Sequence, residues 1–146
     1  METDKGKTEQ WIDELLLAAL IKQYKQFGSL LIAFDFDDTV SMFSVSEGYK
    51  RLHMINRALT ALRFATKQGH KMICYTANPN VEHIKTYCKF NNIQIDYLNR
   101  SPVESGGGKI YYNIFLDDKC GLKSATDTLL AALVKIQDLK ASDSDD

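Results

Sequence analysis

The stretch LLIAFDFDDTV at residues 30–40 decides the fold of this chain. Its first half is apolar without interruption, which is typical of a short strand buried on both faces of a parallel sheet. Its second half brings Asp35, Asp37 and Asp38 close together in the sequence. Carboxylates this close repel one another, and burial raises their pKa values further. A bound cation is the usual compensation, so the stretch indicates a metal site at the end of a buried strand.

Strand and helix patterns alternate along the rest of the chain. Three helices are expected to follow the strands. Ser44 and Glu47 form a possible capping box for one, and Asn78 and Pro79 are the expected N-cap and first-turn proline of the next. Ser124 is the expected cap of the last. Apolar runs that are typical of strands lie at 29–34, 71–75, 93–98 and 110–116. This order predicts an α/β fold, a three-layer doubly wound, Rossmann-like parallel sheet of about four to five strands.

The length of 146 residues suits one domain with a single core. We expect residues 30–140 to form that domain. Residues 1–29 are expected to be an N-terminal helical extension packed on it, because an apolar stripe runs along them and Gly28 ends the pattern. Residues 141–146, with the sequence ASDSDD, are expected to be a disordered acidic tail.

Composition and charge bear on the cellular location of the protein, but they do not identify a binding partner. A formal net charge of −1 argues neither for nor against nucleic acid. No apolar run approaches the roughly 20 residues of a membrane span. The polar start METDKGKTEQ is unlike a secretory signal. Cys74, Cys88 and Cys120 are scattered, which favours reduced thiols and a cytoplasmic location.

Polar side chains follow three of the predicted strands at the point where each strand ends. Asp35 and Asp37 end the first strand, Thr76 the second, and Asp117 and Asp118 the fourth. In open parallel sheets, binding sites form beyond the carboxyl ends of the strands. The sequence therefore predicts that these side chains meet at one edge of the sheet.

Four carboxylates, a threonine and a nearby lysine suit phosphoryl transfer through a covalent aspartyl phosphate. A carboxylate nucleophile divides one difficult displacement into two easier ones. A second carboxylic acid can protonate the leaving oxygen and then activate the water. Mg²⁺ held by oxygen ligands would relieve the repulsion and polarise the phosphoryl group. A hydroxyl and a lysine would bind the remaining phosphate oxygens.

Three stretches of sequence, which together carry four motifs in the correct order, resemble a known family. DFDDT matches the D-x-D-x-T first motif of the haloacid dehalogenase-like superfamily of phosphohydrolases. ICYTANP resembles the second motif of that superfamily, and GKIYYNIFLDD resembles its third and fourth motifs. The resemblance covers roughly residues 30–139, and KIYYNIFLDDKCGL also resembles small members from bacteria and their phages.

The resemblance implies roles for the aspartates. Asp35 would be the nucleophile and would bind Mg²⁺ through its side chain. Asp37 would be the general acid and base and would bind the metal through its backbone carbonyl. Asp117 would bind Mg²⁺, with Asp118 helping directly or through water.

The resemblance also implies a phosphate-binding pair. Thr76 would bind phosphate, and Lys109 would steady both the nucleophile and the phosphate. Lys109 lies only eight positions before Asp117, so we keep three rivals for its role: Lys85, Lys89 and Lys119.

Two features separate the chain from many members of the superfamily. Many small relatives have an arginine where this chain has Asn78. Asp35 and Thr76 are 41 positions apart, which leaves room for one helix and its loops but not for a folded cap domain. The site is therefore expected to be open, which permits a large substrate.

The sequence thus predicts a capless, Mg²⁺-dependent phosphohydrolase that cleaves a phosphate monoester. A non-catalytic binding module with the same fold is one alternative. A phosphotransferase, or a phosphatase for nucleotides or nucleic-acid ends, is another. No basic stripe with interleaved aromatic residues is evident, so the sequence does not support nucleic acid, although an open site leaves it room.

Overall fold

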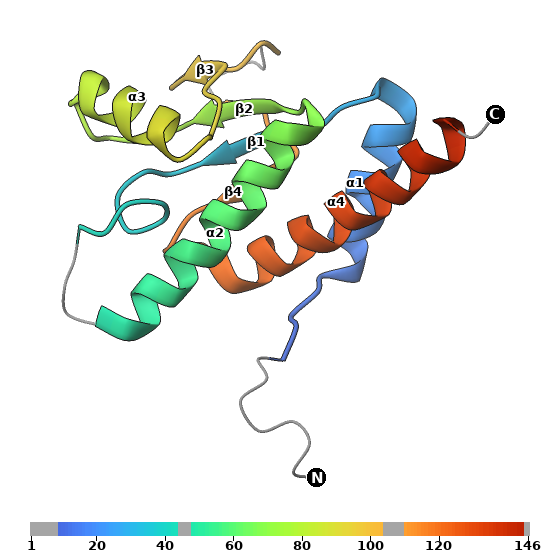
Figure 1. The fold of residues 1–146 in the computed structure, drawn as a ribbon, viewed down its shortest axis with the longest axis horizontal. Helices are drawn as coiled ribbons and strands as arrows, with labels where there is room; N and C mark the ends of the chain where they lie inside the picture. Colours follow the sequence, from blue (N-terminus) through green and yellow to red (C-terminus); the bar gives the residue numbers. More distant parts are fainter. Residues whose placement is uncertain (1–8, 44–47, 104–109, 145–146) are drawn as a thin grey trace, which may run out of the picture.

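The computed structural model describes residues 9–43, 48–103 and 110–144. In these segments the chain is an α/β protein with four helices and four strands (Figure 1). Along the chain they are α1 Glu14–Phe27, β1 Leu31–Phe34, α2 Gly48–Gln68, β2 Lys71–Cys74, α3 Val81–Phe90, β3 Tyr97–Leu98, β4 Ile114–Leu116 and α4 Leu122–Ser144.

The four strands form one parallel sheet in the order β3-β2-β1-β4. The predicted α/β class and parallel sheet are confirmed, and the arrangement is consistent with a Rossmann-like three-layer fold. The apolar first half of the opening stretch becomes β1, which pairs with a strand on each side and is buried throughout. Within the described residues, no helix combines the length and the apolar character that a membrane crossing needs.

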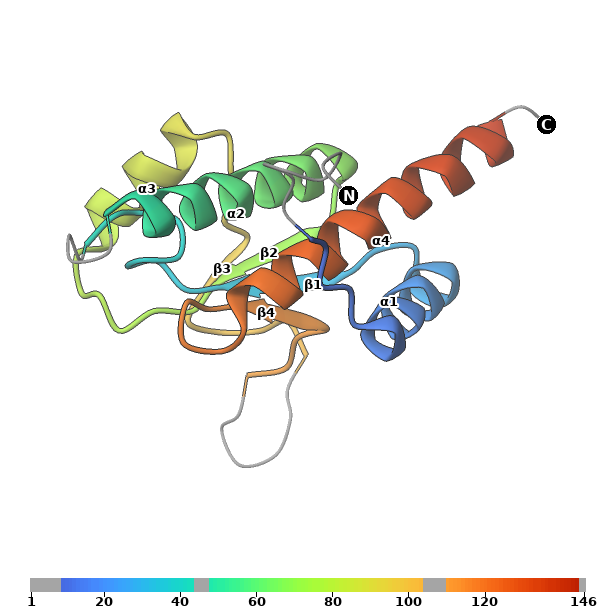
Figure 2. The ribbon, with the colours of Figure 1, turned by 90° about the horizontal axis from the view of Figure 1, so that it is seen from below.

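Side chains on β1 alternate between two apolar clusters. Ile32 and Phe34 belong to the larger cluster, to which all four helices contribute. Three of these helices, α2, α3 and α4, lie on the same side of the sheet (Figure 2). α1 packs along α4. Leu31 and Ala33 point to the opposite face, as the period of two in a strand requires.

The opposite face of the sheet has a different cover. Its buried residues are Leu31, Ala33 and Ile73, and the partly buried apolar residues packed on them are Tyr97, Ile110, Tyr112 and Phe115. In the described part of the chain, these covering side chains come from β3, from β4 and from the segment before β4. Among the described residues no helix contributes to this cluster, so aromatic side chains form much of the layer on that face.

Both ends of α1 follow the sequence. The carboxylate of Asp13 accepts a hydrogen bond of 3.0 Å from the backbone N–H of Leu16 and caps the first turn. Gly28 ends the helix with φ +79°, a left-handed conformation that glycine adopts without steric cost.

The third and fourth strands are each four residues shorter than predicted, and a side chain bonds to the neighbouring strand just before each of them. Asp96 precedes β3, and its carboxylate accepts a hydrogen bond of 2.8 Å from the backbone N–H of Met72. Asn113 precedes β4, and its side-chain oxygen accepts one of 2.6 Å from the N–H of Leu31. A side chain therefore takes the place of the backbone acceptor at each position, and the regular ladder begins one residue later.

The predicted start of α3 was wrong by two residues. The helix begins at Val81, and its N-cap is Asn80, whose side chain accepts a hydrogen bond from the N–H of His83. Asn78 and Pro79 lie before the cap. The predicted capping box at Ser44 and Glu47 lies outside the described residues.

α4 is longer than predicted at both ends. It begins at Leu122 rather than at Ser124, because the N–H of Ala125 already bonds to the carbonyl of Gly121. It continues to Ser144, so residues 141–144 are helical where a disordered tail was expected. No glycine or proline follows residue 139 to end the helix.

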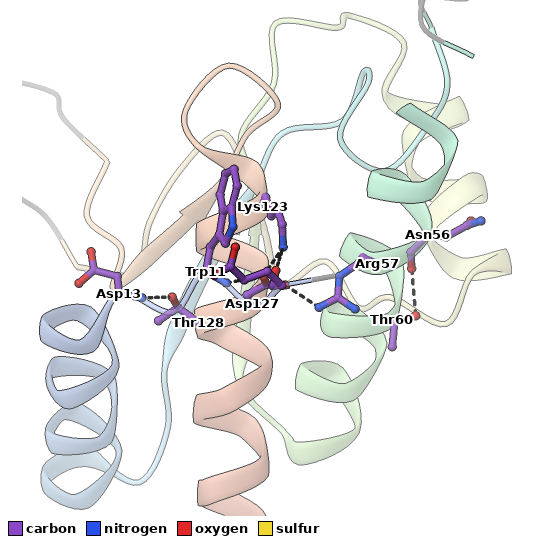
Figure 3. A network of polar contacts seen from close by, with 9 residues as sticks. Trp11, Asp13, Asn56, Arg57, Thr60, Lys123, Asp127 and Thr128 are labelled. Atoms are coloured by element: carbon purple, nitrogen blue, oxygen red, sulfur yellow. Dashed lines mark hydrogen bonds and ion pairs between the residues drawn. The ribbon is translucent and has the colours of Figure 1, made fainter. Parts of the chain in front are cut away.

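Asp127 on α4 joins three parts of the chain (Figure 3). Its carboxylate is buried, with 3% of the residue exposed. It accepts hydrogen bonds of 2.6 Å from Arg57 on α2, 2.8 Å from Lys123 on α4 and 2.9 Å from the backbone N–H of Trp11. The segment before α1 is thereby held against α4.

A second pair of contacts strengthens this attachment. The backbone N–H of Asp13 donates a hydrogen bond of 2.9 Å to the hydroxyl of Thr128 on α4. The ammonium group of Lys123 lies 5.0 Å from the centre of the Trp11 ring, within the range of a cation–π contact. Contacts between residues more than a hundred positions apart thus hold the N-terminal segment in place.

Candidate functional site

A cleft of about 760 Å³ opens beyond the carboxyl ends of β1, β2 and β4. The position agrees with the general rule for parallel sheets. Its lining includes the aspartates that follow β1 and β4, Thr76 after β2, and Arg51 from the first turn of α2. The structure therefore brings together at one edge the polar groups that the sequence places at three strand ends.

Three carboxylates lie together in this cleft. One oxygen each of Asp35, Asp117 and Asp118 lies within 4.8 Å of the others. The backbone N–H of Asp35 bonds to the carbonyl of Leu116 at 2.9 Å, which continues the ladder between β1 and β4 by one residue. The two strand ends are thereby held in register, and the carboxylates are held close to one another.

Burial and mutual repulsion disfavour the charged forms of these groups. Burial raises the pKa of Asp35, and the nearby charges of Asp117 and Asp118 raise it further. Burial also raises the pKa of Asp118, and Asp117 adds to the shift, while the guanidinium of Arg51 opposes it. The chain therefore keeps a group of carboxylates that its own described cations compensate only in part.

The carboxylate cluster fits a small divalent cation. Mg²⁺ prefers oxygen ligands at about 2.0–2.1 Å, so two of its ligands can lie about 4 Å apart. The oxygens of Asp35, Asp117 and Asp118 lie within 4.8 Å of one another and would draw closer around the ion, since adjacent ligands of an octahedral ion lie about 2.9 Å apart. All three groups are hard oxygen donors, and together they carry the negative charge that such a cation would offset.

The side chain of Asp37 has a different partner. The amide nitrogen of Asn78 donates to both of its carboxylate oxygens, at 3.2 Å each. Asp37 therefore lies in the cleft but outside the cluster of three carboxylates. Its predicted contact with a metal is through the backbone carbonyl and stays a prediction. Asn78, expected to cap a helix, instead orients this carboxylate.

Thr76 is held at the cleft by its neighbours. Its backbone N–H donates a hydrogen bond of 2.7 Å to the side chain of Asn99, which follows β3. Its hydroxyl oxygen accepts one of 3.1 Å from the N–H of Asn78. A hydrogen bond with Thr76 also lowers the pKa of Asp35, although less than burial raises it. The hydroxyl is thus adjacent to the predicted nucleophile.

The lysine of the predicted site is not located. Lys109 lies outside the described residues. Of its rivals, Lys119 lines the cleft directly after the aspartate pair, whereas Lys85 and Lys89 lie exposed on α3 and do not line it.

Sequence reasoning gave no role to Arg51 or to the third aspartate of the opening stretch. Arg51 lies 3.4 Å from the carboxylate of Asp118 and 3.9 Å from that of Asp38. Asp38 has φ +62°, and its carboxylate accepts a hydrogen bond of 2.9 Å from the N–H of Phe43. An aspartate tolerates this left-handed conformation because its side chain bonds locally. The dense run of aspartates was a signal for Asp38, but no spacing rule pointed to Arg51.

One solved structure has a similar fold, the conserved protein coded by a locus from Bacteroides thetaiotaomicron. The TM-score is 0.52 at 19% sequence identity, and the match covers 75% of this chain and 92% of the other. This likeness supports the parallel α/β fold alone. No protein-family model matches the chain, and no curated protein matches it either. The resemblance to the haloacid dehalogenase-like superfamily therefore stays a prediction.

Proposed function

We propose that this chain is a Mg²⁺-dependent phosphohydrolase of the haloacid dehalogenase-like type, which cleaves a phosphate monoester through an aspartyl-phosphate intermediate. One observation carries the proposal. Asp35, Asp117 and Asp118 converge in an open cleft that also contains Thr76. An acidic pair at one strand end is common without any function, but this group unites three strand ends. Carboxylates with raised pKa values in a cleft are typical of functional sites.

In this proposal Asp35 is the nucleophile. One of its carboxylate oxygens attacks phosphorus, an acyl-phosphate bond forms, and the bond from phosphorus to the leaving oxygen breaks. Water then attacks phosphorus, which releases inorganic phosphate and restores the carboxylate. The hydroxyl of Thr76 donates a hydrogen bond to a phosphate oxygen. When bound at Asp35, Asp117 and Asp118, Mg²⁺ supplies the positive charge that offsets their repulsion and polarises the phosphoryl group.

Asp37 is the proposed proton carrier. As an acid it gives a proton to the leaving oxygen, and as a base it then takes one from the attacking water. The double contact from Asn78 holds its carboxyl group in the cleft, so Asn78 acts as a positioning residue. In this proposal, Asn78 therefore has a role of its own at the position where many small relatives have an arginine.

The substitution Asp35→Asn tests the proposal. The two side chains have nearly the same shape, but the amide lacks the attacking charge. We expect hydrolysis of a generic aryl phosphate with Mg²⁺ to fall by several orders of magnitude, because the covalent route is closed. Asp138→Asn is the matched control, since Asp138 is an exposed aspartate on α4 away from the cleft. This variant should retain wild-type activity.

Circular dichroism and a melting curve should show that the Asp35→Asn protein is folded. If this folded variant hydrolyses the aryl phosphate at close to the wild-type rate, Asp35 is not the nucleophile. If the wild-type protein itself shows no Mg²⁺-dependent hydrolysis, the non-catalytic binding module becomes the better description.

A further inference from the structure

The direction of Asp35 determines what its substrate meets. Side chains alternate along a strand, and Asp35 lies two residues after Ala33 and four after Leu31. These two residues point to the face of the sheet whose apolar cluster contains no described helix residue. Asp35 therefore projects toward the same face, away from the core formed with α2, α3 and α4. A molecule that binds at Asp35 therefore has the aromatic cover of that face beside it.

Two aromatic rings flank this position. The N–H of Tyr75 bonds to the carbonyl of Phe34 at 2.9 Å, which places Tyr75 beside Asp35 in the ladder, about 4.8 Å away between strands. Phe115 on β4 pairs with Ala33, one row further from the edge on the same face. The Tyr75 and Phe115 rings are 5.9 Å apart between centres, and both line the cleft.

These rings cover the sheet on one side and are left partly exposed on the other. Tyr75 is 44% exposed although it follows a strand that is otherwise mostly buried. Tyr112 extends the surface beyond Phe115, with 5.3 Å between ring centres. We define Tyr75, Phe115 and Tyr112 as the aromatic wall, of which Tyr75 and Phe115 line the cleft and Tyr112 lies beside it. Large aromatic side chains left open in a cleft are typical of ligand contacts. The Tyr75 and Phe115 rings are tilted by 52° to one another, so a planar ligand stacks on the face of one ring and meets the other at an angle.

The two walls of the cleft differ in chemistry. The aspartates lie at the edge of the sheet with Arg51 and Lys119, where an anionic phosphate with its cation would sit. The aromatic wall begins one strand away from Asp35. A substrate that fills both regions has a phosphate group joined to a planar ring system by a short linker. A nucleoside phosphate has this construction, with the ribose as the linker, whereas a plain sugar phosphate leaves the rings uncovered.

We propose that the substrate is a nucleoside phosphate whose base stacks on the aromatic wall, either as a free nucleotide or as the phosphorylated end of an oligonucleotide. This inference rests on the proposed function for its reaction but not for its binding. Stacking of a base on an aromatic side chain is worth a factor of about 10 to 100 in affinity. The sequence showed no aromatic residues interleaved with basic ones, and the folded chain brings aromatic side chains together at the cleft instead.

Equilibrium binding tests the aromatic wall independently of the proposed hydrolysis. The Asp35→Asn protein, which should not turn over, is titrated calorimetrically with a nucleoside monophosphate and with the matching base-free ribose phosphate, both with Mg²⁺. We expect the nucleotide to bind about 10-fold or more tighter. Adding Tyr75→Leu should remove this preference and leave ribose phosphate binding unchanged. Adding Tyr75→Phe should keep the preference, because the ring remains. Phe90→Leu is the control, since Phe90 is exposed at the end of α3 and outside the cleft.

Equal affinity for the two ligands, or a preference that survives both Tyr75→Leu and Phe115→Leu, would overturn the inference. A short oligonucleotide with the same terminal phosphate is the third ligand. Tighter binding of this ligand than of the mononucleotide identifies nucleic-acid ends as the source of the base, and weaker binding identifies free nucleotides. Hydrolysis of the aryl phosphate by the wild-type protein decides the proposed function separately, so a base preference without turnover would overturn the phosphatase and retain the binding site.

Discussion

The pKa of Asp127 on α4 is shifted in the opposite direction from those of two aspartates in the cleft. Asp127 is almost fully buried, and three donors hold its carboxylate. Burial alone would raise its pKa, but the hydrogen bonds from Lys123, the Trp11 N–H and Arg57 together lower it. At the cleft, burial and neighbouring carboxylates raise the pKa values of Asp35 and Asp118.

The difference shows which carboxylates serve the fold and which are left for a ligand. A charge that the protein satisfies with its own donors contributes to stability, because removing it leaves the donors unpaired. A cluster of like charges costs stability until a cation enters. The next three predictions test this distinction, beginning with the largest expected effect.

Replacement of Asp127 by alanine should cost about 3–5 kcal/mol in the free energy of unfolding, because Arg57, Lys123 and the Trp11 N–H lose a common buried partner. Urea unfolding measures this loss. Asp138→Ala, at an exposed position on the same helix, should change the stability by no more than about 0.5 kcal/mol. Asp117→Asn should leave the metal-free protein at least as stable as the wild type. Equal losses from Asp127→Ala and Asp117→Asn would remove the distinction.

His70 should make the stability of the fold depend on pH in a range above the one in which Asp127 acts. Burial and the nearby Lys140 lower its pKa to about 4 from 6.5. Its Nδ1 accepts a hydrogen bond from the Leu30 N–H, so the ring is neutral in the folded protein. The unfolded chain binds the proton more readily, and stability is lost as the pH falls from 6.5 toward about 4. The full loss is about 3 kcal/mol.

Unfolding free energies at about pH 7 and about pH 4.5 measure this effect in the wild type and in His70→Gln. The variant should be less stable at neutral pH and should lose less on acidification. Because the pKa of Asp127 is already lowered from 3.8, its own contribution is lost only below this window. An unchanged acid response in His70→Gln would assign the loss to other groups.

Mg²⁺ should reverse the cost of the carboxylate cluster. An ion that binds only the folded protein stabilises it by about 2.7 kcal/mol at a concentration 100-fold above Kd. We therefore expect a higher melting temperature with millimolar Mg²⁺ than with a chelator. Asp117→Asn should abolish this response, whereas Asp138→Asn should retain it. If the melting temperature of the wild-type protein is the same with Mg²⁺ as with a chelator, the cluster is not a metal site.

Much of the fold could be predicted because it depends on local patterns. The apolar run of 30–34, the glycine after α1 and the alternation of periods were sufficient for β1, for the end of α1 and for the α/β class. The strand boundaries that were wrong lie beside side chains that bond across the structure. Asp96 and Asn113 replace backbone acceptors in the sheet, and nothing in their local sequence indicates this.

The candidate site was predictable to the extent that strand ends determine it. The convergence of Asp35, Thr76, Asp117 and Asp118 follows from the rule that parallel strands end at one edge. The contact of Arg51 with Asp118 and that of Asn78 with Asp37 depend on how α2 and the loop after β2 return to this edge. The aromatic wall was not predicted for a related reason. Tyr75 follows β2, whereas Tyr112 and Phe115 lie before and on β4, and the rings come together only through the register of the sheet.

The central place of β1 has a consequence for the timescale of motion at the cleft. Its neighbours pair with it on both sides, and its residues are buried on both faces. Amide protons in such a strand exchange with solvent only when a large part of the protein opens. Asp35 follows directly on this segment, so we expect its main chain to rearrange slowly compared with the exposed loops that the structure describes. The adjustment needed to admit, turn and release a ligand therefore falls to the side chains around Asp35 and to the ligand itself.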